Sequence, residues 1–88
     1  MSRSVQFTDD AWEQYVAWLS EDKKIVKKIN TLIKEIQRDP FNGTGLPEAL
    51  KNKLSGSWSR RITKEHRVVY KVTDTLVVIT QCKFHYDK

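Results

Sequence analysis

The sequence predicts an α+β fold, in which a short N-terminal strand and an antiparallel helical hairpin pack on a small, mostly antiparallel sheet. Apolar residues recur at spacings of three and four between residues 11 and 36, which is the helical period. The second half of the chain holds three strand-like runs separated by short turns, and connections this short require antiparallel pairing. At 88 residues, the chain is predicted to form a single domain over residues 1–88.

The N-terminal elements are predicted from helix caps and apolar stripes. Residues 4–7 form a candidate strand, and Thr8 before two aspartates is typical of a helix start. Ser20 before two acids repeats this signal and predicts the start of a second helix. Pro40 excludes the preceding residue from a helix, so the second helix should end near Asp39. The stripes predicted to face the core are Ala11, Trp12, Tyr15, Trp18 and Leu19 in the first helix and Ile25, Ile29, Leu32, Ile33 and Ile36 in the second.

The remaining strands are predicted over residues 58–62, 67–72 and 76–84, after a loop at 42–47 and a turn at 55–57. If both hairpin loops hold three residues, paired positions share parity, so side chains of one parity project from one face of the sheet. The polar face would then carry Arg61, Arg67, Gln81, Lys83 and His85. The face towards the helices would carry Trp58, Ile62, Val68, Tyr70, Val72, Val78, Cys82 and Phe84. A two-residue loop in either hairpin would invert this arrangement.

The net charge of +5 lies entirely in the second half of the chain. Residues 41–88 hold nine Lys or Arg against four Asp or Glu, whereas residues 1–40 hold seven of each kind. A field of one sign attracts a polyanion and speeds its encounter with the protein. The charge therefore favours a nucleic-acid partner, although many small basic proteins are merely soluble.

Several classes of function find no support in the sequence. No apolar run approaches the roughly 20 residues of a membrane span and no apolar leader is visible, so we expect a cytoplasmic protein with no membrane partner. Cys82 is the single cysteine and is predicted to be an inert thiol buried in a strand. The histidines and the cysteine show no metal-ligand spacing, and Gly43-Thr44-Gly45 lacks the helix and lysine of a phosphate loop. We therefore expect no metal and no cofactor, and His66 is interpreted as a turn residue.

A candidate site combines a histidine, a carboxylate and several arginines. His85 lies almost at the C-terminus, Glu48 follows a loop proline, and the arginines are Arg60, Arg61 and Arg67. RNA carries its own nucleophile, the 2′-hydroxyl, so a metal-free RNA-cleaving site needs a base, an acid and positive charge at the phosphate. Each residue also has an ordinary structural interpretation, as a polar chain end, a solvated acid or a charged sheet surface.

Four motifs carry a resemblance to a known family. They are Gly43-x-Gly45-x-Pro47-Glu48, Leu54-Ser55-Gly56-x-Trp58-Ser59-Arg60-Arg61-Ile62, Glu65-His66-Arg67-x-Val69-Tyr70 and the terminal His85-Tyr86. With these motifs the chain resembles the Txe/YoeB toxins of the RelE/ParE superfamily of bacterial toxin–antitoxin systems. The resemblance extends from residue 12 to residue 86. The first ten residues match loosely, and Asp87-Lys88 extends past the tyrosine that usually ends the chain.

The resemblance implies a RelE-like fold and a ribosome-dependent mRNA endoribonuclease. Such a toxin cuts the codon in the A site of the 70S ribosome and so inhibits translation, by metal-free acid–base catalysis in which the 2′-hydroxyl attacks. The resemblance also implies neutralisation by a Phd/YefM-type antitoxin, binding of operator DNA only as the toxin–antitoxin complex, and a homodimer as one state of the toxin.

The same resemblance assigns roles to individual residues. Glu48 would be the general base, His85 the general acid and Arg67 the stabiliser of the transition state. The predicted substrate-binding residues are Lys51, Arg60, Arg61, Lys83 and Tyr86. Two alternatives stay open. A non-enzymatic ParE-like toxin that inhibits gyrase would need neither Glu48 nor His85, and a pure nucleic-acid-binding module would use basic side chains on phosphates without a role for His85.

Overall fold

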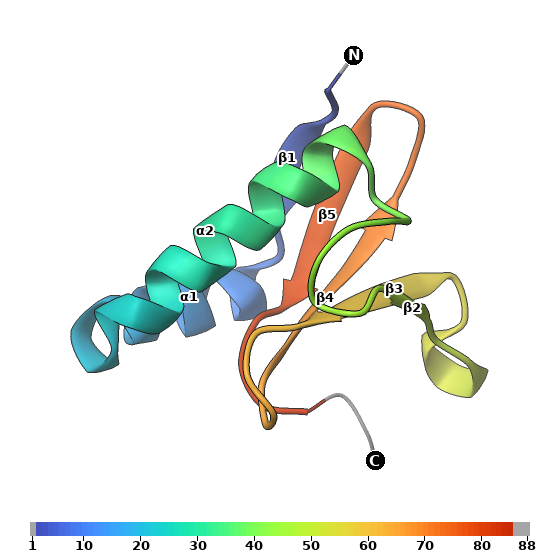
Figure 1. Ribbon diagram of the computed structural model, residues 1–88. Coiled ribbons are helices and arrows are strands. Elements are labelled where there is room, and N and C mark those ends of the chain that lie inside the picture. Colours follow the sequence, from blue (N-terminus) through green and yellow to red (C-terminus); the bar gives the residue numbers. More distant parts are fainter. Residues whose placement is uncertain (1, 86–88) are drawn as a thin grey trace.

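The computed structural model describes residues 2–85. Two helices cover one face of a five-stranded sheet, so the α+β fold predicted from the sequence is confirmed (Figure 1). The helices are α1 (Asp9–Glu21) and α2 (Lys23–Arg38). The strands are β1 (Ser4–Phe7), β2 (Glu48–Ala49), β3 (Ser57–Arg61), β4 (Arg67–Val72) and β5 (Leu76–Gln81), and a short 3-10 helix, η1 (Asn52–Leu54), precedes β3.

The sheet has the strand order β1-β5-β4-β3-β2. β1 pairs with β5 in parallel, and the other three pairs are antiparallel, as the short connections predict. β5 is the last strand along the chain, yet it lies inside the sheet between β1 and β4. The N-terminal strand therefore joins the sheet only through the C-terminal one.

The helix boundaries follow from side-chain caps. Thr8 caps α1 as predicted, because its Oγ1 accepts a hydrogen bond from the backbone N–H of Ala11 at 3.2 Å. The predicted cap at Ser20 is wrong: α1 continues through Ser20, and Asp22 caps α2. The Asp22 carboxylate accepts from two amides of the first turn of α2 at 3.0 and 3.4 Å, while its own N–H donates to a carbonyl of α1. One residue thus ends one helix and begins the next, which keeps the hairpin tight; α2 ends at Arg38, next to the predicted end.

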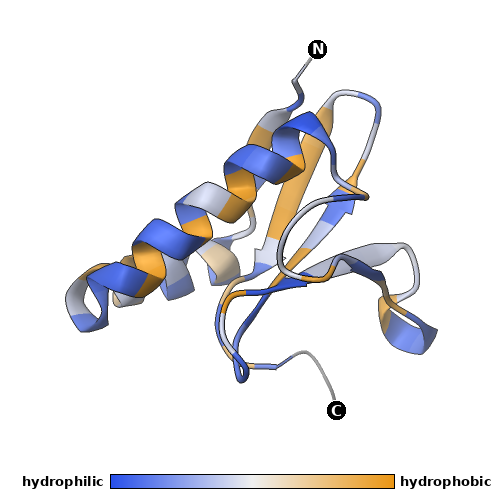
Figure 2. Ribbon diagram, in the orientation of Figure 1, coloured by the Kyte–Doolittle hydropathy of each residue, from blue (hydrophilic) through white to orange (hydrophobic). Residues whose placement is uncertain are grey.

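The core lies between the helices and the sheet, where apolar residues of α2 and β5 face each other (Figure 2). Its buried members are Ala11, Trp18, Val26, Ile29, Leu32, Ile33, Ile36, Ile62, Val68, Tyr70, Val77, Ile79 and Cys82. The prediction that Trp12 and Leu19 belong to the core is wrong, since they are 52% and 46% exposed. Both are rotated by about 80–100° around the α1 axis from the line through Ala11 and Trp18 that meets the sheet.

The β4–β5 hairpin differs from the predicted register. Four residues separate the paired Val72 and Val77, and an even number inverts the parity between the strands. Val77 therefore faces the helices and Val78 faces away, so the prediction for Val78 is wrong. A bulge at Thr80 then restores the predicted parity, because Val69 pairs with residue 81 while Tyr70 pairs with residue 79.

The last core residue, Cys82, follows the bulge and the end of β5. Cys82 is fully buried, as predicted, and its thiol donates to the carbonyl of Ala11 at 3.5 Å. β5 ends at Gln81 rather than at the predicted residue 84. Phe84 is 60% exposed with φ +64, so its predicted place towards the helices is wrong. The strand alternation on which that prediction rested does not extend past Gln81.

Candidate active site

One face of the sheet, turned away from the helices, gathers three of the predicted site residues, Glu48, Arg61 and Arg67. Directly opposed residues in a sheet share a face. Glu48 lies opposite Ser59, and Arg61 lies opposite Arg67. Ser59 and Arg61 are two residues apart on β3, so all four belong to one face. This confirms the prediction that Arg61 and Arg67 share a face, and adds Glu48 to them.

The long side chains of this face differ in depth. Glu48 and Arg61 are exposed, as are Lys51, two residues after β2, and His85. Arg67 is only 8% exposed. The small side chains of the same face, Ser57, Ser59 and Val69, are buried, so the longer charged side chains project beyond them.

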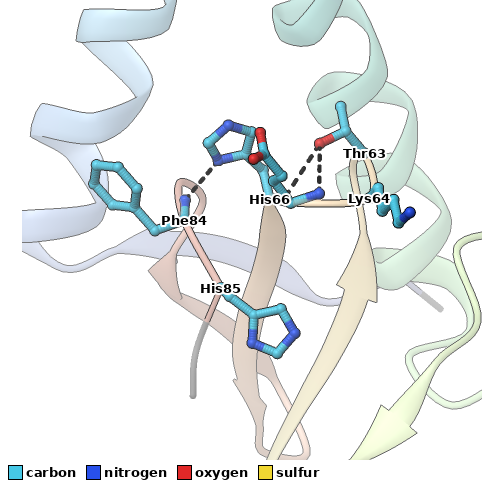
Figure 3. A pocket seen from close by; sticks show the side chains of 6 residues that line it. Thr63, Lys64, His66, Phe84 and His85 are labelled. Atoms are coloured by element: carbon cyan, nitrogen blue, oxygen red, sulfur yellow. Dashed lines mark hydrogen bonds between the residues drawn. The ribbon is translucent and has the colours of Figure 1, made fainter. Parts of the chain in front are cut away.

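A shallow open pocket of about 930 Å³ lies where the β3–β4 loop meets the C-terminal segment (Figure 3). Its lining residues are Thr63, Lys64, Glu65, His66, Phe84 and His85. The Thr63 hydroxyl orders the loop, because it accepts hydrogen bonds from the backbone N–H groups of Glu65 and His66 at 3.2 and 3.1 Å.

Arg67 supports the same loop from the first position of β4. Its Nη1 donates to the carbonyls of Thr63 and Lys64 at 2.9 Å each and to that of His66 at 3.3 Å. Carbonyl dipoles solvate the guanidinium without neutralising it, so positive charge remains beside the pocket. The sequence placed Arg67 on the polar face; its role in holding the loop was not predicted.

The segment that carries His85 is attached to β4 through its backbone. The Phe84 N–H donates to Nδ1 of His66 at 2.7 Å, and the Phe84 carbonyl accepts from the Arg67 N–H at 3.1 Å. Gln81 Nε2 also donates to the carbonyls of Lys83 and Phe84 at 2.8 and 3.1 Å. These bonds bring His85 to the end of the sheet that holds Arg67. Sequence reasoning missed His66 as part of this arrangement.

The prediction that Lys83 shares the polar face with Arg61 and His85 is wrong. Its ammonium pairs with the Glu21 carboxylate of α1 at 3.0 Å and lies 4.9 Å above the ring of Trp18. The reason is the end of β5 at residue 81, which releases Lys83 from strand alternation. Lys83 thus ties the chain to α1 in this structure, and a phosphate contact would require that ion pair to open.

Arg60 is a correction to the predicted substrate-binding set. Its side chain is fully buried on the helix side of the sheet, because it alternates with Arg61. Nε donates to the Tyr70 hydroxyl at 3.2 Å, and Nη1 pairs with a Glu35 oxygen at 3.1 Å and donates to the Thr44 carbonyl at 3.3 Å. Nη2 donates to the carbonyls of Asp39 and Asn42 at 2.6 and 2.8 Å. With every guanidinium nitrogen bonded inside the protein, Arg60 cannot reach a substrate phosphate here.

The loop around Arg60 depends on glycine. Gly43 has φ +133, and a Cβ there would lie 2.7 Å from Nη1 of Arg60 and 2.8 Å from Oε1 of Glu35. Gly45 has φ +83, and a Cβ there would lie 3.1 Å from Cβ of Arg60. The Gly43-x-Gly45 motif is therefore explained by close packing against a buried arginine.

The surroundings of Glu35, Tyr70 and Cys82 move the pKa values of these groups from their ordinary range. Hydrogen bonds from the Thr44 backbone and hydroxyl, with the Arg60 charge, lower the pKa of Glu35 against a smaller effect of burial. Burial raises the pKa of Tyr70, against the hydrogen bond from Arg60. Burial also raises the pKa of Cys82 to about 12, which makes the thiol unreactive at neutral pH, as predicted.

Within residues 2–85, no three His, Cys, Asp or Glu side chains lie where they could hold a metal ion together. Over the same range neither helix is long and apolar enough to cross a membrane. Tyr86, predicted to orient the substrate, lies outside the described residues.

Comparison with known sequences agrees with the motifs. The profile of the YoeB-like toxins of bacterial type II toxin–antitoxin systems matches residues 7–86. The chain belongs to this family. Toxin YoeB of Escherichia coli K12 is 55% identical over 80 residues, which are 91% of this chain and 95% of that protein.

Solved structures of related toxins share the fold over nearly the full length. The YoeB dimer from Staphylococcus aureus superposes with a TM-score of 0.90 at 46% identity, covering 98% of this toxin and 100% of that chain. A heterotetrameric YoeB–YefM toxin–antitoxin complex from the same organism gives a TM-score of 0.87 at 46% identity and the same coverage. The suspected Txe/YoeB membership is thus confirmed.

Proposed function

We propose that this toxin is a ribosome-dependent endoribonuclease that cleaves mRNA in the ribosomal A site without a metal. One observation carries the proposal. The sheet register groups Glu48, Arg61 and Arg67 on one face, and the hydrogen bond from the Arg67 N–H to the Phe84 carbonyl fixes the segment bearing His85 beside them. A carboxylate, guanidinium groups and an imidazole at one end of a basic sheet match the needs of RNA cleavage.

In the proposed mechanism the RNA supplies the nucleophile. Glu48 takes the proton of the 2′-hydroxyl, and the oxygen attacks the adjacent phosphorus. The bond from phosphorus to the 5′ oxygen breaks, and His85 protonates that oxygen, which leaves a 2′,3′-cyclic phosphate and a 5′-hydroxyl. Each positioned proton transfer contributes about 10²–10⁴-fold.

Positive charge stabilises the phosphorane-like transition state. Arg67 takes this role, because carbonyls hold its Nη1 in place and no carboxylate within residues 2–85 forms an ion pair with it. The exposed Arg61, opposite Arg67 in the sheet, and Lys51, after β2, hold the flanking phosphates. Tyr86 would orient the substrate base.

Dependence on the ribosome follows from the openness of the site. Glu48, Lys51, Arg61 and His85 are all exposed, and the pocket that His85 lines is shallow. An open site of this size orients a flexible RNA poorly, whereas the A site presents the codon in a fixed geometry. Action on ribosomes also means a cytoplasmic location.

The deciding experiment maps cleavage of mRNA on 70S ribosomes with a programmed, empty A site. Native toxin should cut within the A-site codon, and Glu48→Gln and His85→Ala should each slow the cut by at least about 10²-fold. Glu13→Gln, which alters an exposed acid on α1 far along the chain from the site, should cut at the native rate. Absence of cleavage by folded native toxin would contradict the nuclease and direct the next test to gyrase binding. Equal cleavage of free and ribosome-bound mRNA would contradict ribosome dependence.

The same surface suits an antitoxin. The S. aureus YoeB relative forms a complex with YefM and a dimer, which supports a Phd/YefM-type antitoxin and a homodimer for this toxin. Binding of operator DNA by the toxin–antitoxin pair is proposed from the family resemblance alone. An acidic segment that folds on binding would cover the basic face or displace the segment after Cys82. Modification of His85 by diethyl pyrocarbonate, located by mass spectrometry, should change in the complex: it should fall if the antitoxin covers the site and rise if the antitoxin displaces the segment. Unchanged reactivity would contradict both modes of inhibition.

A further inference from the structure

Phe84 has an unusual backbone conformation directly before the candidate acid. Its φ of +64 lies in the left-handed region, which residues other than glycine seldom adopt. Such a conformation persists only where surrounding contacts hold it. Here the Phe84 N–H donates to Nδ1 of His66 at 2.7 Å, and its carbonyl accepts from Arg67 and Gln81 at 3.1 Å each.

His66 is itself fixed on several sides. Its N–H donates to the Thr63 hydroxyl at 3.1 Å, and its carbonyl accepts from the Ile62 N–H at 2.9 Å. Its ring meets the Trp18 ring edge to face at a centroid distance of 4.8 Å. Trp18 in turn is held by the hydrogen bond from its Nε1 to the Cys82 carbonyl at 2.8 Å. The Nδ1 atom is therefore presented to Phe84 from a rigid support.

The geometry fixes the protonation of this ring. An amide N–H is only a donor, so Nδ1 must accept, and the neutral ring carries its proton on Nε2. A doubly protonated ring would present an N–H to another N–H and lose the bond. In this arrangement His66 cannot serve as a proton donor through Nδ1, and its part differs from that of His85.

We infer that His66 is a positioning residue, which holds Phe84 in the left-handed conformation and thereby sets where the His85 imidazole lies. The inference rests on the proposed function, because positioning matters for catalysis only if His85 acts as the acid. Figure 3 shows the His66 ring beside the Phe84 N–H and the His85 ring away from it, so the effect passes through the main chain rather than through contact between the rings. Relaxation of Phe84 to negative φ would turn the backbone that leads into His85.

Three substitutions of His66 separate the hydrogen bond from the ring. His66→Asn places an amide oxygen near the position of Nδ1 and can restore the acceptor. His66→Gln places its amide at the position of Nε2, and His66→Phe keeps an aromatic ring against Trp18 without an acceptor. At saturating ribosomes, Phe and Gln should lower the single-turnover cleavage rate by about 10²-fold, and Asn should recover most of it. Ribosome affinity should stay near native in all three.

Hydrogen exchange of the Phe84 amide tests the bond without requiring activity. Exchange should be slow in the native toxin and His66→Asn, and fast in His66→Phe and His66→Gln. Glu21→Gln, which removes the Lys83 ion pair but leaves this bond, should exchange like the native toxin. A merely structural role would lower the melting temperature and the cleavage rate together across the series, without selective rescue by Asn.

The outcomes are distinguishable from those of the proposed function. Native cleavage by His66→Phe, or loss by His66→Asn equal to that of His66→Phe at similar melting temperature, would overturn the positioning role. A native toxin with no cleavage would overturn the catalytic inference together with the nuclease. In that case the exchange data would still establish whether His66 orders Phe84.

Discussion

The loop around Arg60 and the loop around Arg67 are built alike, but the charge of Arg60 is paired with a carboxylate and that of Arg67 is held by neutral carbonyls. In both loops, a guanidinium donates hydrogen bonds to several backbone carbonyls of an irregular connection. Around Arg60, a Glu35 carboxylate and the Tyr70 hydroxyl complete the set and the side chain is fully buried. Around Arg67, the partners are neutral carbonyls bound to one nitrogen, beside an open pocket.

The same residue type thus stabilises the fold in one loop and serves the proposed catalysis in the other. A buried guanidinium requires a counter-charge and a full set of acceptors. A guanidinium meant to meet a phosphate must keep its charge and still be held in place. Arg60 fulfils the first condition and Arg67 the second, so substitutions at the two should separate folding from cleavage.

The largest effect is expected at Arg60. Arg60→Ala leaves Glu35, the Tyr70 hydroxyl and three carbonyls without their donor, and should lower the free energy of unfolding by about 3–5 kcal/mol. Arg61→Ala, its exposed neighbour, should change that free energy by no more than about 0.5 kcal/mol while weakening cleavage. Urea denaturation of the two variants measures the contrast, and equal destabilisation would refute it.

The next effect separates charge from geometry at Arg67. Arg67→Lys keeps the positive charge but lacks the planar fork that reaches several carbonyls. We expect cleavage to slow by about 10²-fold and the free energy of unfolding to fall by about 1–2 kcal/mol. Cleavage on programmed ribosomes and urea denaturation provide the two values. A native cleavage rate would show that charge alone suffices.

Alanine substitutions at two glycines separate the cost of close packing against Arg60 from the cost of backbone strain alone. Gly45→Ala combines φ +83 with a Cβ 3.1 Å from both Cβ of Arg60 and the Arg61 carbonyl, and should cost about 1–3 kcal/mol. Gly56→Ala is the matched control, since its φ of +93 is similar but no heavy atom lies within 4 Å. Backbone strain alone should cost about 1 kcal/mol there. Equal melting temperatures would mean that the Arg60 contact adds nothing.

The smallest effect is a pH dependence from Glu35. Its pKa is lowered in the folded state, so ionised Glu35 contributes stability above the ordinary value of 4.5, and that contribution is lost as the pH falls through the lowered pKa. Stability measured from about pH 6 to pH 3 should decline less steeply in Glu35→Gln than in the native toxin. Parallel curves would show that Glu35 does not couple to folding.

Local patterns predicted most of the fold, and pairing over long distances decided the rest. The Thr8 cap, the α2 stripe and the start of β4 follow from neighbouring residues, and the structure confirms them. The register of β5 depends on whether three or four residues separate the paired ends of β4 and β5, and on the bulge at Thr80. The face on which each β5 side chain lies cannot be predicted without both.

The site was predicted unevenly for the same reason. Arg60 has the parity of Trp58 and Ile62, which the sequence already placed towards the helices, so that parity was the available signal for its burial. The contact between His66 and Phe84 joins residues 18 positions apart, and a turn motif carries no sign of it. Glu35 became visible as the partner of Arg60 only when α2 was placed over the sheet.

The position of β5 inside the sheet has a consequence for synthesis. β5, the last of the five strands in chain order, lies between β1, the first, and β4. β1 therefore has no partner strand until β5 has been synthesised, whereas β4 can already pair with β3. At about 5–20 residues per second, the N-terminal half waits several seconds without a complete sheet. The segment bearing His85 follows β5 in the chain, so the proposed active site is among the last parts of the described fold to assemble during synthesis.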